Sequence, residues 1–512
     1  MDVKTIMRRS VDAWPDTEAV VQRDRRLSFS QAWDRGVRLA NILREAGLKP
    51  GDKIAVLEDN TLEAADFLLA CTIGNFVRVP LYVRNSPDSH LHMVGHTECK
   101  AMVIAANHID EAMPIAEQVS SVNYTLVRDD TYESLLAAAS PDDIATPINE
   151  DDLYLIRHTG GTTARSKGVA FTHRRWISTA RDWLYNWPTI EMGDAFLHQS
   201  PISHGSGYFF MPAWMNGARN VMLEKLEPNL VLEIIEKEKI THMLGIPTIL
   251  SFIVRHPDVD KRDVSSIKGI VVSGAPVSES TAHLSHRVFG DALFTGFGQT
   301  EINPVTFMTA REWFDPKFPE RIFSAGRVQP FAEMRILDPD THEDLPVGAE
   351  GELAARSDGQ MIELWGEPKE TAARIHDGWI LTGDVGRLDE HGYLFIMDRK
   401  GDTIISGGFN IYPAELENAI TSHPAVSEVA VFAIPNVKWG ESPAAVCVVA
   451  DLDAVTAEEI IALCVDRLGS YKKPAEVVIR TEPLPKNAAG KLLRRQLREP
   501  YWEGHARRVS GS

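Results

Sequence analysis

The sequence of 512 residues lacks the features that mark membrane, secreted and nucleic-acid-binding proteins. No apolar run approaches the ~20 residues that cross a bilayer, and the first residues hold no apolar segment typical of a secretory signal. A net charge of −19 argues against nucleic acid, whose binding needs a basic surface. The remaining composition, 44% hydrophobic and 24% charged, is that of an ordinary globular protein. We therefore expect a cytoplasmic protein without a membrane span or a nucleic-acid partner.

Cysteine is scarce, and the few cysteines lie far apart, without the paired spacing of a metal site or a disulfide framework. We expect them to be reduced and buried as small hydrophobic residues. They are Cys71, Cys99, Cys447 and Cys464.

Internal repeats, low-complexity segments and an obvious Pro/Gly/Ser linker are also missing. At this length we nevertheless expect more than one domain. Short β-branched runs alternate with helical segments, which favours an α/β fold with buried sheets. The expected strands are 53–57, 77–81, 101–104 and 269–272, and the expected helices are 63–70, 230–238 and 247–254.

A loop rich in glycine and threonine, residues 159–168, is the first candidate for chemistry. Glycines let backbone N–H groups approach an anion, and the hydroxyls and Lys167 add donors and charge. The loop follows 153–156, which reads as a buried strand, and α/β proteins usually bind ligands at strand ends. It is not a Walker A loop, because Ser166 precedes Lys167 and Gly168 follows it. Alone, such a cluster could equally be a surface turn.

Further polar signatures follow downstream. Residues 296–301 combine an aromatic ring, a hydroxyl and a carboxylate, which could stack on a purine, contact a phosphate and hold Mg²⁺. Asp384 could accept both hydroxyls of a ribose and Arg399 could donate to the same sugar. Each also has an ordinary reading, as a polar turn or a surface ion pair. Lys491 stands near the end of the chain in a glycine-flanked segment.

In this order and spacing, the motifs resemble those of the adenylate-forming superfamily, which contains acyl-CoA synthetases, peptide-synthetase adenylation domains and firefly-type luciferases. The resemblance covers nearly the whole chain and is strongest to an AMP-forming acyl-CoA synthetase. The matching segments are 159–168, 274–276, 296–301, 350–353, 382–384, 406–417 and 484–491.

The resemblance implies ATP, Mg²⁺ and CoA as cofactors or co-substrates, and a role for each matched residue. Thr162, Thr163 and Lys167 would bind the β- and γ-phosphates, and Phe297 would stack on adenine. The remaining nucleotide-binding positions would be Thr159, Gly160, Gly161, Gly274, Ala275, Pro276, Asp384 and Arg399. The catalytic positions would be Thr300 at the α-phosphate, Glu301 on Mg²⁺, His204 at the acyl pocket and Lys491 between the carboxylate and the α-phosphate. Gly408 would leave room for the pantetheine of CoA.

The resemblance also implies a large N-terminal α/β domain of several subdomains, residues 1–399, and a small mobile C-terminal α+β domain, residues 400–512, which carries Lys491. Within the second, strands at 428–433 and 444–449 and a helix at 457–468 are expected. The sequence departs from the family pattern at Ala164 and Ser166 of the phosphate loop and at Gly401 of the hinge. Glycine permits a large backbone rotation, so domain movement should remain possible.

The expected function is an ATP-dependent acid–CoA ligase that acts on a small carboxylic acid, with a bulky apolar or cyclic acid ahead of acetate. Transfer to a carrier-protein thiol is the main alternative. An oxygenase of the luciferase type, a phosphotransferase that releases ADP and an inactive binding module are weaker alternatives. The chain could form a homodimer.

Overall fold

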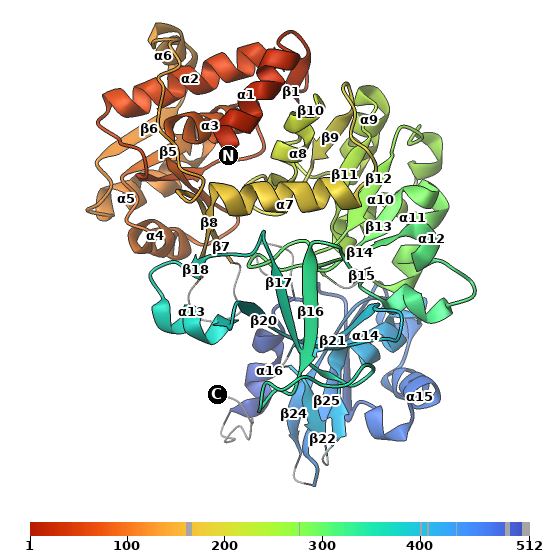
Figure 1. Cartoon of the computed structure of the whole chain (residues 1–512). Helices are drawn as coiled ribbons and strands as arrows, with labels where there is room; N and C mark the ends of the chain where they lie inside the picture. The colour runs from red at the N-terminus through yellow and green to blue at the C-terminus, as the bar shows by residue number, and fades with distance from the viewer. Residues whose placement is uncertain are drawn as a thin grey trace.

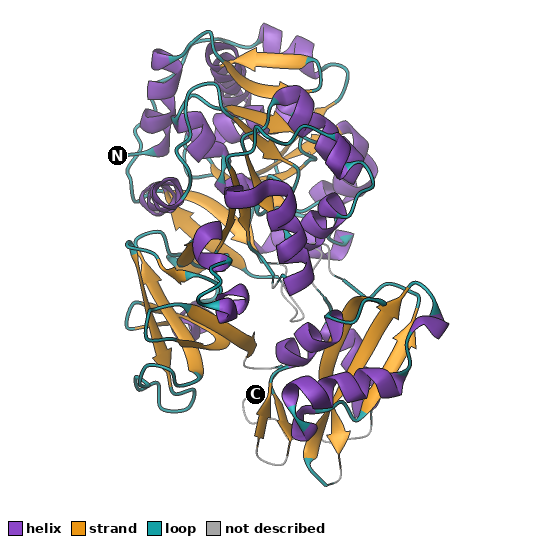
Figure 2. Ribbon diagram, turned by 90° about the vertical axis from the view of Figure 1, so that its right-hand side faces the viewer, coloured by secondary structure: helices purple, strands orange, loops and turns teal. Residues whose placement is uncertain are grey.

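The computed structural model describes residues 1–159, 166–275, 277–399, 402–406, 409–436, 438–486 and 492–503, and only the backbone of 398–399 and 409–410. Across these residues the strands form four sheets. Three belong to a large body, and the fourth belongs to a smaller lobe that lies below it (Figures 1 and 2). The predicted fold, a large α/β part followed by a smaller α+β part, is therefore present. The boundary at residues 399–400 stays a prediction.

The first sheet has the strand order β18-β8-β7-β4-β3-β5-β6, with a parallel centre. Its central strands are buried on both faces, as expected when helices cover a parallel sheet. The strands are β3 (Lys53–Leu57), β4 (Val77–Leu81), β5 (Ala101–Ala105), β6 (Tyr124–Arg128), β7 (Leu153–His158), β8 (Gly168–Thr172) and β18 (Glu363–Leu364). The accompanying helices are α1 (Val3–Ala13), α2 (Phe29–Glu45), α3 (Leu62–Gly74), α4 (Pro87–His96), α5 (Ile109–Gln118) and α6 (Tyr132–Ala138).

The second sheet has the order β15-β14-β13-β12-β11-β9-β10-β1-β2. Helix α7 (His173–Asn186) runs between the first two sheets (Figure 1), and the largest hydrophobic cluster contains residues of both. The strands are β1 (Glu18–Gln22), β2 (Arg25–Ser28), β9 (Ala195–His198), β10 (Arg219–Met222), β11 (His242–Gly245), β12 (Gly269–Val272), β13 (Leu293–Thr295), β14 (Thr306–Thr309) and β15 (Arg327–Val328). The other helices are α8 (Phe210–Met215), α9 (Pro228–Glu238), α10 (Pro247–Val254), α11 (Glu279–Phe289) and α12 (Ala310–Trp313).

The third sheet follows the order β16-β17-β20-β19, with β21 paired to β20. Its elements are β16 (Ala332–Leu337), β17 (Gly351–Ser357), α13 (Pro368–Arg374), β19 (Ile375–His376), β20 (Trp379–Leu388) and β21 (Leu394–Arg399). The fourth sheet has the order β23-β22-β25-β24, with β26 on β25. It contains β22 (Ile404–Ser406), β23 (Phe409–Ile411), α14 (Pro413–Thr421), β24 (Val426–Asn436), β25 (Gly440–Val449), α15 (Ala457–Leu468), β26 (Glu476–Arg480) and α16 (Arg494–Trp502).

Most predicted elements occur at the expected positions. The strands at 53–57, 77–81 and 269–272 and the helices at 247–254 and 457–468 match to the residue. The helix predicted at 63–70 is longer, because it begins after Thr61 and continues until Asn75 ends it in a left-handed conformation, φ 55°. The four cysteines are free and buried, as predicted.

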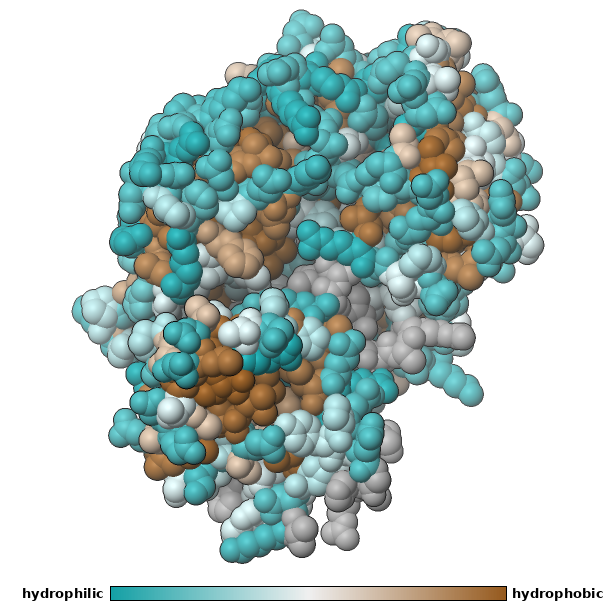
Figure 3. All heavy atoms as spheres, turned by 180° about the vertical axis from the view of Figure 1, so that it is seen from behind, coloured by the Kyte–Doolittle hydropathy of each residue, from teal (hydrophilic) through white to brown (hydrophobic). Residues whose placement is uncertain are grey.

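Seen from behind, the surface is mostly hydrophilic, with hydrophobic patches on its upper and lower parts (Figure 3). Within the described ranges, no helix is both long and apolar enough to cross a membrane.

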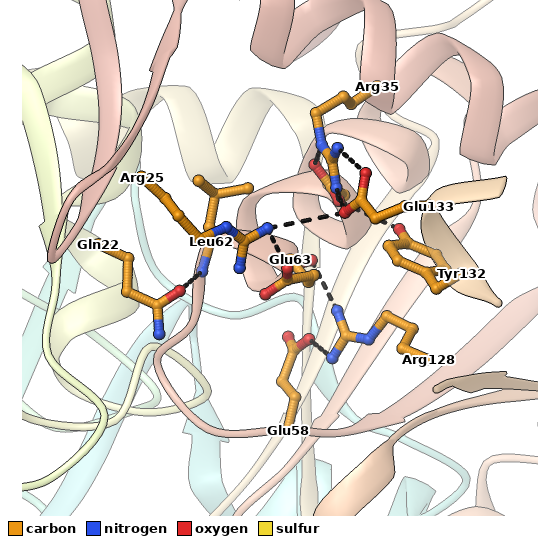
Figure 4. Close-up of polar contacts among 10 residues, drawn as sticks. Gln22, Arg25, Arg35, Glu58, Leu62, Glu63, Arg128, Tyr132 and Glu133 are labelled. Carbon is orange, nitrogen blue, oxygen red and sulfur yellow. Dashed lines mark hydrogen bonds and ion pairs between the residues drawn. The ribbon is translucent and has the colours of Figure 1, made fainter. Parts of the chain in front are cut away.

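A network of buried ion pairs joins α2, α3 and β6 (Figure 4). No sequence motif predicted it. Arg128 donates to the Glu58 carboxylate at 2.5 Å and to the Glu63 carbonyl at 2.6 Å. Arg35 holds the buried Asp66 carboxylate with two hydrogen bonds of 2.8 and 2.9 Å. The network borders a hollow of about 770 Å³. Because these arginines are paired with carboxylates, we interpret the network as structural.

We predict that Arg128→Met destabilises the chain by about 3–5 kcal/mol, because Glu58 would remain as a buried charge without its partner. The double variant Arg128→Met/Glu58→Leu should recover most of that loss. Urea unfolding followed by tryptophan fluorescence measures both. A double variant as unstable as the single one would contradict this interpretation.

Candidate nucleotide and acyl site

The predicted phosphate loop joins two antiparallel strands of the first sheet, β7 and β8. Its base is closed by a hydrogen bond from the Thr159 amide to the Lys167 carbonyl at 3.0 Å and by the Ser166 hydroxyl, which donates to the Thr159 carbonyl. The predicted contacts at Gly160, Gly161, Thr162 and Thr163 lie outside the described residues, as do Ala164 and Arg165.

Lys167 lies at the end of this loop and pairs with Glu370 of α13, with 2.6 Å between Nζ and Oε2. The Lys167 ammonium lowers the pKa of Glu370. Helix α13 is held beside the loop because β18, just before it, pairs with β8. Lys167, at the end of the loop between β7 and β8, and the neighbouring helix α13 therefore form one edge of the candidate site.

Glu301, the predicted Mg²⁺ ligand, is bound by the other end of the same helix. The Arg374 guanidinium donates to the Glu301 carboxylate at 3.0 Å and to the Gln299 side-chain oxygen at 3.2 Å. Glu301 is buried, and its carbonyl accepts from the Met361 amide at 2.8 Å. Helix α13 thus contacts the charged side chains of two predicted ATP motifs.

Asp384, the predicted ribose ligand, reaches the same place from β20. The Gln299 amide donates to the Asp384 carboxylate at 2.6 Å and to the Thr382 carbonyl at 2.9 Å, across 85 and 83 positions of sequence. Asp384 pairs with Arg399 across β20 and β21, which brings the backbones of these two predicted residues together. The Arg399 side chain lies outside the described part.

The adenine-binding positions lie at the ends of neighbouring parallel strands, β12 and β13. Gly274 follows β12 with φ 94°, a conformation that favours glycine. Gly296 and Gly298 follow β13 in a tight turn, where an added Cβ would lie 2.5 Å from the Thr306 carbonyl or 2.3 Å from the Asn303 side-chain oxygen. Phe297 is buried, with 9% of its surface exposed.

The adenine turn continues through Ala275, which is described, to Pro276, which is not. The predictions at Lys491 and Gly408 likewise fall outside the described residues.

His204, predicted at the acyl pocket, stacks on Tyr82 at the end of β4, with 5.7 Å between ring centroids. Its loop is fixed by Asn60, whose side chain donates to the carbonyls of His198 and Ser200 at 2.7 Å and accepts from the Ile202 amide at 2.7 Å. Asn60 and Tyr82 follow strands of the first sheet, so the loop bridges the two larger sheets.

Thr300 is tied to the same loop. The Tyr208 hydroxyl donates to the Thr300 carbonyl at 3.4 Å. Sequence reasoning missed Asn60, Tyr82, Tyr208 and Arg374, because none belongs to a motif. Gln299 was quoted within a motif but given no role.

A divalent cation is compatible with this donor set. Among the described side chains, no cluster of three or more His, Cys, Asp and Glu residues is arranged to hold a metal. Mg²⁺ needs no such cluster, because in nucleotide sites it binds one or two carboxylates together with substrate phosphates. The Glu301 carboxylate fits that requirement.

Comparison with known proteins identifies the class. Residues 7–365 match the family of AMP-binding enzymes, and residues 415–491 match the C-terminal domain of AMP-binding enzymes. The chain belongs to this family, as the motifs predicted.

Relatives cover almost the whole chain. It is 32% identical to a feruloyl-CoA synthase of an Amycolatopsis species, over 95% of this chain and 96% of the relative. It is 30% identical to ScoC of Streptomyces coeruleorubidus, a fatty acid–[acyl-carrier-protein] ligase, over 97% and 96%. Among solved structures, it is similar to ATP-bound MatB from Rhodopseudomonas palustris, with a TM-score of 0.89, 27% identity and coverage of 99% and 100%.

Burial governs the charge of His158, the last residue of β7. Neither ring nitrogen has a hydrogen-bond partner among the described residues. Burial lowers the pKa of His158 from 6.5 to about 3, and it lowers the pKa of His198 to about 4. Both folded pKa values lie below the unfolded value, so the unfolded chain binds protons first, and stability falls as the pH drops below about 6.5.

We predict that the unfolding temperature falls between pH 7 and pH 4, and falls less in His158→Phe. Each such histidine contributes up to about 1.4 kcal/mol per pH unit to this loss. His283→Phe, at an exposed position of α11, is the matched control and should follow the wild type. Scanning calorimetry at several pH values measures the effect. An unchanged pH dependence in His158→Phe would contradict the assignment.

Proposed function

We propose that this chain is an ATP-dependent acid–CoA ligase. It would activate a carboxylic acid as acyl-AMP with release of pyrophosphate, and then transfer the acyl group to the thiol of CoA. One observation carries the proposal: hydrogen bonds through Gln299 and Arg374 connect the carboxylates of Glu301 and Asp384. The helix that carries Arg374, α13, also pairs with Lys167 of the phosphate loop. The proposal rests further on the acid–CoA ligases among its relatives, which include the feruloyl-CoA synthase.

The first step needs little more than positioning and charge compensation. A carboxylate oxygen attacks the α-phosphorus of ATP, the bond to the bridging oxygen breaks, and pyrophosphate leaves. The barrier is mainly crowding of negative charge, which fixed cations relieve. Lys167 would meet the β- and γ-phosphates and Lys491 would bridge the two reacting anions. A Mg²⁺ ion held by Glu301 would supply further positive charge.

Nucleotide binding would exchange ion pairs that the chain already makes. Lys167 would replace Glu370 with phosphate oxygens. Asp384, held toward the motif by Gln299, would accept the ribose hydroxyls. Phe297 and the turn at Gly274 would enclose the adenine from neighbouring strand ends.

The second step would use the other face of the small domain. Rotation about the boundary at residues 399–401 would withdraw Lys491 and bring Gly408 to the acyl-AMP. The missing side chain would leave room for pantetheine. The thiol sulfur then attacks the acyl carbon, a thioester forms, and AMP leaves with the carboxylate-derived oxygen.

Transfer to a carrier-protein thiol is the second candidate, because a fatty acid–[acyl-carrier-protein] ligase is also among the relatives. For the acid itself, we propose a bulky or cyclic compound. Two relatives support this choice by name, the feruloyl-CoA synthase and a Rhodococcus jostii ligase for a 7a-methyl-1,5-dioxo-octahydroindenyl propanoyl group.

The test is pyrophosphate release with ATP and Mg²⁺ over a panel of carboxylic acids, with and without CoA, followed by mass spectrometry of the products. We expect AMP and an acyl-CoA. Acyl-AMP that forms and ignores CoA would favour the carrier-protein alternative. ADP in place of AMP would overturn the proposal.

We predict that Lys491→Ala slows acyl-AMP formation by about 10²-fold or more, because it removes charge that acts on the transition state. Thioester formation from supplied acyl-AMP should remain largely intact. Lys486→Ala, which removes a lysine paired with Glu428 at 2.9 Å in the same segment, is the matched control and should affect neither step strongly. Equal loss of both half-reactions in Lys491→Ala would contradict the assigned role.

A further inference from the structure

One buried arginine beside the proposed acyl region has no role in the function described so far. Arg157, on β7, is 1% exposed. None of its three guanidinium nitrogens lies in hydrogen-bond geometry with a described residue, and no described carboxylate acts on its charge. Burial lowers the pKa of Arg157, and the charge of Arg78 lowers it further, whereas the neighbouring Tyr208 opposes the shift.

The surroundings of this guanidinium are aromatic and positive. It lies 4.2 Å from the centroid of the Tyr208 ring and 5.2 Å from that of Trp176. Arg78, another buried arginine, pairs with Leu155 across β4 and β7, so it projects from the same sheet face as Arg157. Its Nε also lacks a hydrogen-bond partner in the described part of the chain. Cation–π contacts compensate only part of the cost of burying a charge.

Contacts of this cluster connect it to the acyl region. A Cβ added to Gly207 would lie 3.1 Å from Arg157 Nη2, so the loop that carries His204 passes directly over the guanidinium. Tyr208, whose ring contacts the same guanidinium, donates its hydroxyl hydrogen to the Thr300 carbonyl. Arg157 therefore lies between β7 and the loop that, under the proposed function, borders the acid.

We propose that Arg157 is a specificity-determining residue, which binds an oxygen acceptor on the acyl group, a second carboxylate or a ketone, remote from the carboxylate that is activated. The inference rests on the proposed function and deepens it. A guanidinium presents a planar fork of N–H donors that suits both kinds of acceptor. A substrate oxygen there would satisfy a buried cation that the described residues leave unpaired. The preferred acids are therefore oxygen-bearing ones, and plain hydrocarbon acids are poorer substrates.

The experiment compares three acids that differ at one remote position only. On the acid scaffold most active in the pyrophosphate assay, that position carries a carboxylate, an acetyl group or an isopropyl group, which are similar in shape. Wild type should use the carboxylate or the acetyl acid with a kcat/KM about 10- to 100-fold above that of the isopropyl acid. A higher kcat/KM for the carboxylate acid than for the acetyl acid indicates that Arg157 binds a charged acceptor. A higher kcat/KM for the acetyl acid indicates a neutral acceptor.

Arg157→Met should remove this preference, and the isopropyl acid should become the best of the three. Arg157→Lys keeps a charge without the planar fork and should give an intermediate ratio, which provides a second variant if the first folds poorly. Arg174→Met, at an exposed arginine of α7 paired with Asp151, is the matched control and should keep the wild-type ratio.

Three outcomes would overturn the inference: a wild-type preference for the isopropyl acid, a ratio unchanged in both Arg157 variants, or an equal loss on all three acids. The last would make Arg157 a support for the neighbouring loop. These failures differ from failure of the proposed function, in which no acid at all gives AMP and pyrophosphate.

Discussion

The candidate site depends on the junction between Gln299 and Arg374. Gln299 follows β13 of the second sheet and holds Asp384 of the third, while Arg374 at the end of α13 holds both Gln299 and Glu301. These bonds are partly buried, and an unpaired carboxylate or guanidinium there would be costly. The junction therefore holds together the two carboxylates that we propose for the ribose and for Mg²⁺, Asp384 and Glu301.

Helix α13 extends this control to the phosphate loop. Glu370, in its first turn, forms an ion pair with Lys167, and Arg374, its last residue, forms an ion pair with Glu301. A short helix thus contacts both the cation that we propose for the β- and γ-phosphates and the carboxylate that we propose for Mg²⁺. Its place is set by β18, which adds to the hairpin of β7 and β8. The loop, the helix and the motif after β13 form one unit although they are distant in sequence.

How much of this the sequence predicts depends on the kind of signal. Periodic and β-branched runs located strands such as 269–272 to the residue, because burial on both faces of a parallel sheet leaves a continuous apolar run. Glu301 and Asp384 were found because they stand in short motifs. Arg374 and Arg157 were not, because the neighbours of each are brought close only by the fold. An arginine in a strand carries no mark in sequence that tells a surface cation from a buried one.

The most direct test of the central claim follows one oxygen atom. The acid is labelled with ¹⁸O in its carboxylate and turned over with ATP, Mg²⁺ and CoA, and the nucleotide product is analysed by mass spectrometry. Attack by the carboxylate on the α-phosphorus predicts AMP that carries one ¹⁸O. Unlabelled AMP, or label in inorganic phosphate beside ADP, would contradict an acyl-AMP intermediate at this site.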